Sequence, residues 1–284
     1  MTKKPVQKLQ AALDEVLLRK GARKVEEIPE DVIRLLQKGQ IQSVNLTEWL
    51  AIDHLQLLSV IVDELDLRKE VDPMLQRCSQ WSETRIMKII PAIASEWLQS
   101  LETFSTNDQQ RIFHGLATHA SDSVRCWAAY MIGLDPQLGL AEKLETMRPF
   151  AADAHFGVRE ISWMAVRESL SQEVMEAITF LAEWVQEEDP SIRRFAVEAT
   201  RPRGVWAKHI PELKENPELG LPLLEAVKAD SSRYVQDSVA NWLNDASKTK
   251  PDWVQQVCAE WLERSNSKET IRIVTRAQRS LMKK

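Results

Sequence analysis

A pattern that recurs along the chain constrains the fold more than any other feature. An Asp- or Ser-rich turn is followed by Val or Ile, then by a polar anchor residue, and then by an apolar helical stretch. The anchors are Arg85, Arg125, Arg159, Arg193, Gln236 and Arg272, of which the first and last belong to weaker copies. Successive anchors lie 40, 34, 34, 43 and 36 residues apart, and each interval holds a second helix. Helix pairs with this period bury their apolar faces by stacking on one another, as HEAT and armadillo repeats do. The sequence therefore predicts an all-α protein, an α-solenoid of HEAT-like helical repeats.

The repeat pattern divides the chain into two parts. It is regular in the later part of the sequence and weak in the first 70 residues. We therefore expect residues 1–80 to form a helical N-terminal cap or a set of degenerate repeats. Residues 81–284 are expected to form the HEAT-like repeat domain, with a basic concave groove.

Composition excludes several classes of protein. The chain has only eight Gly, and none lies in the Gly-rich phosphate loop of nucleotide-binding folds. The three Cys are far apart, which excludes a disulfide framework and a zinc motif and favours a reducing compartment. The longest apolar run, residues 57–62, is too short for a membrane span, and residues 1–10 lack a secretion signal. We expect a cytoplasmic protein without membrane contact.

The histidines give no metal-binding pattern. His114 and His119 are five residues apart, a spacing that places two side chains on different faces of one helix. No GxSxG-type nucleophile motif is present. The sequence therefore predicts neither a metal ion nor a cofactor.

The repeat register also gathers positive charge. Although the net charge is -5, residues 189–209 hold five Lys or Arg against two Asp or Glu. The second helix of each repeat lines one surface of a solenoid, so the candidates for phosphate contact are Arg125, Arg159, Arg193, Arg194, Arg201, Arg203, Lys208 and Arg233. An alternative interpretation stays open, in which these arginines pair with acids of the next repeat and form an internal ladder.

Two of the tryptophans are candidates for the same groove. Trp163 follows Arg159 by four residues, which places both on one helical face. Trp206 follows a segment, residues 201–204, that is too broken for a core helix. Aromatic rings interleaved with arginines can hold nucleic acid through charge and stacking. The tryptophans that we expect in the core or between helices are Trp49, Trp97, Trp184, Trp253 and Trp261.

Three segments together resemble a known family. They are VREISWMAVR at 158–167, IRRFAVEATRPRGVW at 192–206 and SRYVQDSVANWLNDASK at 232–248. These segments are similar to the bacterial DNA alkylation repair HEAT-repeat proteins, nearer to the AlkC branch than to the AlkD branch. The resemblance covers about residues 121–261 and does not extend to the N-terminal third.

The resemblance implies a DNA glycosylase that removes alkylated purines, such as 3-methyladenine or 7-methylguanine, from duplex DNA. Such an enzyme needs no cofactor, no metal and no obligate protein partner, because the positive charge of the alkylated base already weakens the glycosidic bond. The protein supplies shape, a grip on phosphates and a carboxylate beside the oxocarbenium-like sugar.

The carboxylate itself is left open among three acids. The AlkD-type pattern of two adjacent Trp followed by Asp is absent, and the candidates in order of preference are Glu160, Asp237 and Glu198. Asn241 and Asn244, on the same repeat as Asp237, are candidates for contacts to the DNA backbone or for bracing adjacent helices. Two further functions remain as alternatives, a catalytically silent DNA-binding solenoid and a protein-binding scaffold.

Overall fold

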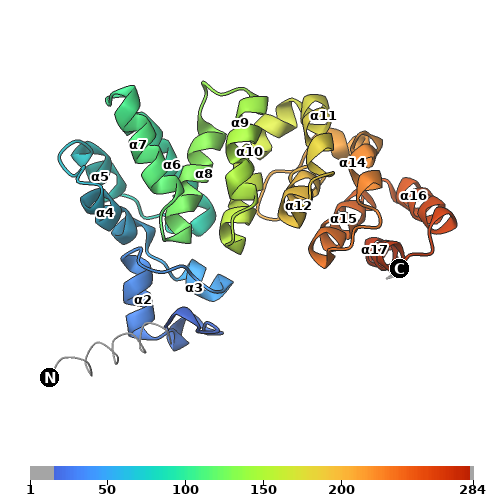
Figure 1. Ribbon diagram of the computed structural model, residues 1–284, viewed down its shortest axis with the longest axis horizontal. Helices are drawn as coiled ribbons and strands as arrows, with labels where there is room; N and C mark the ends of the chain where they lie inside the picture. Colours follow the sequence, from blue (N-terminus) through green and yellow to red (C-terminus); the bar gives the residue numbers. More distant parts are fainter. Residues whose placement is uncertain (1–15, 282–284) are drawn as a thin grey trace. The chain divides into compact units, whose positions relative to one another are not determined.

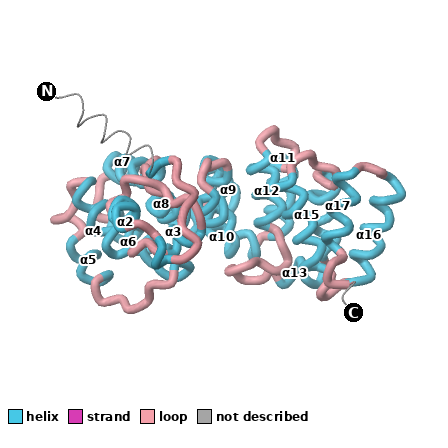
Figure 2. The backbone as a smooth tube through the Cα atoms, turned by 90° about the horizontal axis from the view of Figure 1, so that it is seen from below, coloured by secondary structure: helices cyan, strands magenta, loops and turns pink. Residues whose placement is uncertain are grey.

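The computed structural model describes residues 16–281, and every regular element within that range is helical (Figure 1; Figure 2). The predicted all-α repeat fold is confirmed. The chain divides into two compact units, Met1–Met131 and Ile132–Lys284. The predicted division into a cap and a repeat domain at residue 80 concerns repeat type rather than compactness and stays a prediction; residues 1–15 of that cap lie outside the described range.

The N-terminal unit is built from short and medium helices. In chain order they are η1 (Val25–Glu27), α2 (Glu30–Gln37), α3 (Leu46–Leu50), α4 (His54–Glu64), α5 (Asp72–Cys78), α6 (Ile86–Leu101), α7 (Thr106–Ala117) and α8 (Asp122–Leu134), whose last residues belong to the second unit. Its core holds Trp49, Trp97 and Trp127, each no more than 2% exposed. Trp49 and Trp97 were predicted as core residues, and that prediction is confirmed.

The C-terminal unit consists of two layers of helices. Its elements are α9 (Leu140–Ala151), α10 (Phe156–Gln172), α11 (Val174–Trp184), α12 (Pro190–Ala199), α13 (Pro211–Glu215), η2 (Pro217–Gly220), α14 (Leu221–Ala226), α15 (Arg233–Ala246), α16 (Pro251–Arg264) and α17 (Lys268–Ala277). Helices α10, α12, α15 and α17 pack on one another in that order and form the first layer, which Figure 1 shows from yellow-green to red. Helices α9, α11, α14 and α16 form the second layer.

The anchor residue of the repeat pattern closes the turn that precedes its helix. Arg159 donates from Nη1 to the carbonyls of residues 153 and 154, at 2.6 and 2.9 Å. Arg125 and Arg193 make the same pair of bonds, to the carbonyls six and five residues earlier. The amide of Gln236 does so as well, at 2.7 Å to the carbonyl of Asp230. The pattern therefore recurs because each turn needs a long side-chain donor for carbonyls that the helix leaves unpaired.

Local sequence fixes where the first-layer helices begin. Asp189 caps α12 by accepting from the backbone N–H of Ser191 at 2.7 Å, and Pro190 fits the first helical position. Ser267 caps α17 by accepting from the backbone N–H of Thr270 at 3.1 Å. These caps set the register of the side chains that face along the layer.

Two searches of the described residues complete the fold. Between residues 16 and 281, no helix has the length and apolar character that crossing a bilayer requires. In the same range, no group of three or more His, Cys, Asp and Glu side chains is arranged to hold a metal ion.

Candidate active site

Three carboxylates and two guanidinium groups alternate across consecutive helices of the first layer. Glu160 lies on α10, Glu198 on α12 and Asp245 on α15. Arg194 donates to Glu160 Oε1 at 2.6 Å. Arg201 donates to Glu198 and reaches Asp245 Oδ2 at 2.6 Å. We call these five residues the charge network; two of its acids were predicted as candidates, and the network links them in space.

The middle carboxylate of the network is buried and ionised. The side chain of Glu198 is 4% exposed and accepts hydrogen bonds from Arg201 and from the Ser238 hydroxyl. Burial by itself raises the pKa of Glu198, but the charges of Arg194 and Arg201 and the bond from Ser238 outweigh it, so the pKa lies below its usual value. Glu198 is therefore a fixed negative charge with its bonding positions filled from within the protein.

Glu160 differs from the other two acids in its exposure. Its side chain is 28% exposed, against 4% for Glu198 and 6% for Asp245. Its second oxygen, Oε2, accepts from Trp163 Nε1 at 2.9 Å. The predicted sharing of one helix face by Glu160 and Trp163 is confirmed. Of the three acids, Glu160 can best meet a molecule that docks from solvent.

The two predicted tryptophans have opposite surroundings. Trp206 is 56% exposed, beside Val205 at 54%, in the segment that joins α12 to α13. Its backbone has φ of 59°, a conformation that costs a non-Gly residue roughly 1–2 kcal/mol. The expected exposure of Trp163 on a groove is wrong, because its ring is 1% exposed and packs within the first layer. Trp206 therefore presents an apolar surface that Trp163 does not.

The row of predicted arginines is engaged within the protein. Arg193 holds Asp230 with two bonds, at 2.6 and 3.0 Å, in addition to the carbonyls of its turn. Arg159 donates from Nε to the Tyr234 hydroxyl at 3.2 Å, and Arg125, 8% exposed, makes its turn contacts. These contacts agree with the internal ladder that the sequence left open. Contact with phosphate stays a prediction for these side chains.

Other predicted contact residues lie nearer the solvent. Arg233 is exposed at the start of α15, and Arg203 is half-buried. Lys208 is 81% exposed and pairs with Glu168 at 2.8 Å, an exposed pair that competes weakly with a phosphate. These three basic side chains flank Trp206 in sequence or begin the next first-layer helix.

The third predicted acid belongs to a different contact. Asp237 accepts from Arg272 at 2.7 Å and pairs with Arg276 at 3.1 Å, which joins α15 to α17. Asn241 accepts from Arg279 at 2.9 Å. Asn244 is buried and donates to the carbonyl of residue 277 at 2.9 Å, which is the bracing role the sequence had left open. Asp237 is not part of the charge network.

Sequence reasoning missed two residues of this region. Asp245 completes the charge network, and Arg167 contacts the segment that carries Trp206. Their partners lie 44 and 41 residues away in sequence, so no local pattern reveals them. The available signal for Arg167 is its spacing, four residues after Trp163 on one helical face.

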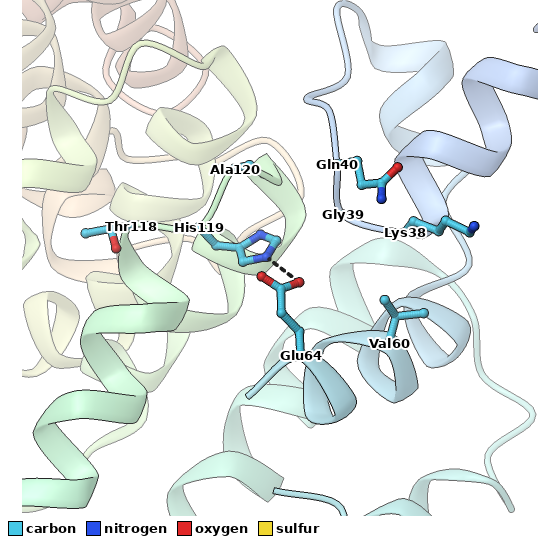
Figure 3. A pocket seen from close by; sticks show the side chains of 8 residues that line it. All are labelled: Lys38, Gly39, Gln40, Val60, Glu64, Thr118, His119 and Ala120. Carbon is cyan, nitrogen blue, oxygen red and sulfur yellow. Dashed lines mark hydrogen bonds and ion pairs between the residues drawn. The ribbon is translucent and has the colours of Figure 1, made fainter. Parts of the chain in front are cut away.

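A separate cavity lies within the N-terminal unit. It measures about 610 Å³ and is bordered by the ends of α2, α4 and α7 (Figure 3). His119 Nε2 faces Glu64 Oε2 across it at 3.4 Å. No predicted site residue lines the cavity.

Comparisons with known proteins place the second unit in context. Residues 138–277 match the sequence model of a family described as DNA alkylation repair enzyme. The chain is 37% identical over 148 residues to YhaZ of Bacillus subtilis, an uncharacterized protein, over 52% of this chain and 40% of that one. The chain thus spans less than half of that relative's length.

Solved structures share the fold. An alkylpurine DNA glycosylase, AlkC of Pseudomonas fluorescens, bound to DNA containing an abasic-site analog, matches with a TM-score of 0.55 and 24% identity, over 78% of this chain and 63% of AlkC. AlkD2 of Streptococcus mutans matches with a TM-score of 0.56 and 25% identity, over 74% of this chain and 97% of AlkD2. Both likenesses agree with a HEAT-like helical repeat solenoid.

Proposed function

Because the match of residues 138–277 makes this chain a member of the DNA alkylation repair enzyme family, we propose that it is a DNA glycosylase that releases alkylated purines from duplex DNA. The observation that carries the proposal is the charge network, in which Glu160, Glu198 and Asp245 are held by two arginines on three consecutive helices. The family membership gives the chemical context, and the network gives the residues.

The chemistry asks for negative charge in a fixed place. When the bond between sugar and alkylated purine breaks, positive charge develops on the sugar and the base leaves neutral. A carboxylate about 4 Å from that charge contributes about 4 kcal/mol at an effective dielectric constant of about 20. That energy corresponds to an acceleration of about a thousandfold. Glu160 is our candidate for this carboxylate, because it is the partly exposed acid of the network.

The network also prepares Glu160 for this task. Arg194 and Trp163 each hold one of its oxygens, so its orientation is set before a substrate arrives. Preorganised charge of this kind needs no rearrangement when the transition state forms. Glu198 and Asp245 keep the two arginines oriented and are supporting acids in this proposal.

Binding of the duplex would draw on the exposed basic and aromatic side chains. Arg203, Lys208 and Arg233 supply positive charge for phosphates, which fix the register of a duplex without reading its sequence. Trp206 supplies an exposed ring for stacking on a base or sugar face. The partner proposed here is therefore damaged duplex DNA.

One observation favours a second function. Both carboxylate oxygens of Glu160 already accept hydrogen bonds from protein groups, which weakens the field that reaches a bound sugar. A catalytically silent protein with the same fold would use the basic side chains and Trp206 to bind DNA and would leave the bond intact.

Base release from methylated DNA separates the two functions. Purified protein is incubated with DNA treated with a methylating agent, and free 3-methyladenine and 7-methylguanine are quantified against a sample without protein. The enzyme reading predicts release above that background by the wild type. It also predicts a fall of at least a hundredfold for Glu160→Gln, with binding to undamaged DNA unchanged.

A matched control keeps the interpretation sharp. Glu183 is an exposed acid on α11, in the second layer, and Glu183→Gln should release base at the wild-type rate. Binding without release by the wild type would favour the silent protein. Release by Glu160→Gln at the wild-type rate would remove Glu160 from the mechanism.

A further inference from the structure

The segment that carries Trp206 is closed on itself and filled by one side chain. The N–H of Ile210 donates to the carbonyl of Pro202 at 3.1 Å, which ties the two ends of the segment together. Arg167, which is 3% exposed on α10, donates to three backbone carbonyls around it. These are the carbonyls of Lys208 at 2.6 Å, of Ala199 at 2.8 Å and of Arg201.

The geometry of these bonds requires a guanidinium. Two of the three carbonyls lie at the C-terminal end of α12, where the helix leaves them without a partner, and the third lies at the far end of the segment. A planar fork of donors can reach both ends at once, whereas a Lys ammonium is a single point.

The segment is shaped around that guanidinium. At Gly204, a Cβ would lie 3.1 Å from Arg167 Nε and 3.2 Å from its Cζ, tighter than ordinary contact. Burial and the charge of Arg201 lower the pKa of Arg167 to about 10, while Glu198 and Asp245 oppose that change. A cation held in this place against burial therefore serves the segment rather than the surface.

Arg167 also belongs to the helix face that carries the candidate catalytic acid. Glu160, Trp163 and Arg167 stand at positions i, i+3 and i+7 of α10. The guanidinium lies 5.8 Å from the centroid of the Trp163 ring, and the Trp163 N–H holds Glu160. One helix face thus contacts both Glu160 and the segment of Trp206.

We propose that Arg167 is a positioning residue that, through the backbone of residues 199–208, holds the exposed ring of Trp206 in a fixed place relative to Glu160. The proposal rests on the proposed function, in which Trp206 meets the damaged duplex. In this role Arg167 contacts neither base nor sugar. Its effect reaches the DNA through Trp206.

The first test observes Trp206 without any DNA. The protein has ten Trp, and labelling with 5-fluorotryptophan gives each ring its own ¹⁹F resonance. Trp206→Phe identifies the resonance of Trp206. In Arg167→Met and Arg167→Lys we expect this resonance to move toward the free amino acid position and to broaden. The Trp163 resonance should shift as well, and the other eight should stay in place, which shows that the fold is intact.

A second variant perturbs the same contact while it keeps the charge. Gly204→Ala should displace the guanidinium by a few tenths of an ångström and shift the Trp206 resonance in the same direction. An unchanged Trp206 resonance in Arg167→Lys and in Gly204→Ala overturns the proposal. If Arg167→Met moves all ten resonances, the variant has lost its fold, and the two milder variants decide.

The second test asks whether Arg167 acts through Trp206. Single-turnover release of methylated base should fall at least tenfold in both Arg167→Lys and Trp206→Ala. The double variant should fall no more than twofold below Trp206→Ala, because the ring that Arg167 positions is already gone. Losses that multiply would mean that Arg167 acts independently, which overturns the proposal.

The two tests separate failure of the proposal from failure of the proposed function. If the wild type releases no base, the glycosylase assignment fails, and the same cycle is run on affinity for duplex DNA with an abasic-site analog. Non-additive losses of affinity support positioning by Arg167, and additive losses contradict it.

Discussion

Neutralising Glu198 probes the charge network at its centre. Glu198→Gln keeps the shape of the side chain and removes the charge that lies between Arg194 and Arg201. Removing one partner of a buried ion pair costs about 3–5 kcal/mol of stability. Arg194 keeps Glu160 and Arg201 keeps Asp245 as partners, so we expect the lower end of that range, about 3 kcal/mol.

The pH dependence of this loss has a definite sign. The pKa of Glu198 is lower in the folded protein than the ordinary value of 4.5, so the unfolded chain binds more protons in acid. The contribution of Glu198 is fully present above pH 4.5 and is lost as the pH falls through the lowered value. The difference between wild type and Glu198→Gln should therefore be constant near pH 7 and shrink in acid.

Urea denaturation followed by circular dichroism at pH 7 and at pH 3.5 measures both effects. The matched control is Glu168→Gln, which breaks the exposed pair with Lys208 and should change stability by no more than about 0.5 kcal/mol. A loss for Glu198→Gln as small as that of the control, or one that grows in acid, would refute the buried network.

Three further predictions follow from other contacts. Arg193→Ala should lower stability by about 1–3 kcal/mol, because it opens a turn and leaves Asp230 unpaired, and should leave the salt dependence of DNA binding unchanged in a filter-binding titration. Arg233→Ala should weaken binding to all DNA sequences and reduce the slope of log K against log salt by about one, measured in the same assay. Gly133→Ala should cost at least about 3 kcal/mol in thermal unfolding, because its Cβ would lie 2.2 Å from the backbone oxygen of Ala165, where α8 and α10 approach.

The repeat fold could be predicted because one local need recurs in every repeat. Each turn before a first-layer helix leaves two carbonyls that a long donor satisfies, and this need places Arg or Gln at a fixed position. The same fact explains why the role of these arginines could not be predicted. A guanidinium serves a carbonyl and a phosphate equally well in sequence, and only the fold shows which it meets first.

The candidate site could be predicted in part. Glu160 and Trp163 were placed on one face by their spacing, and the exposure of Trp206 was indicated by the broken segment before it. The burial of Trp163 depends on the packing of α10 against its neighbours, which spacing does not give. Asp245 and Arg167 act on partners in other repeats, so their roles follow from the register between helices that are far apart in sequence.

The central claim is that this protein breaks the bond between sugar and alkylated purine with Glu160 as the stabilising carboxylate. The most direct measurement is the single-turnover rate of 3-methyladenine and 7-methylguanine release from methylated duplex DNA by the wild type and by Glu160→Gln. We predict release by the wild type and a rate at least a hundredfold lower for the variant, with equal DNA affinity. No release by folded, DNA-bound wild type, or equal release by both proteins, would contradict the claim.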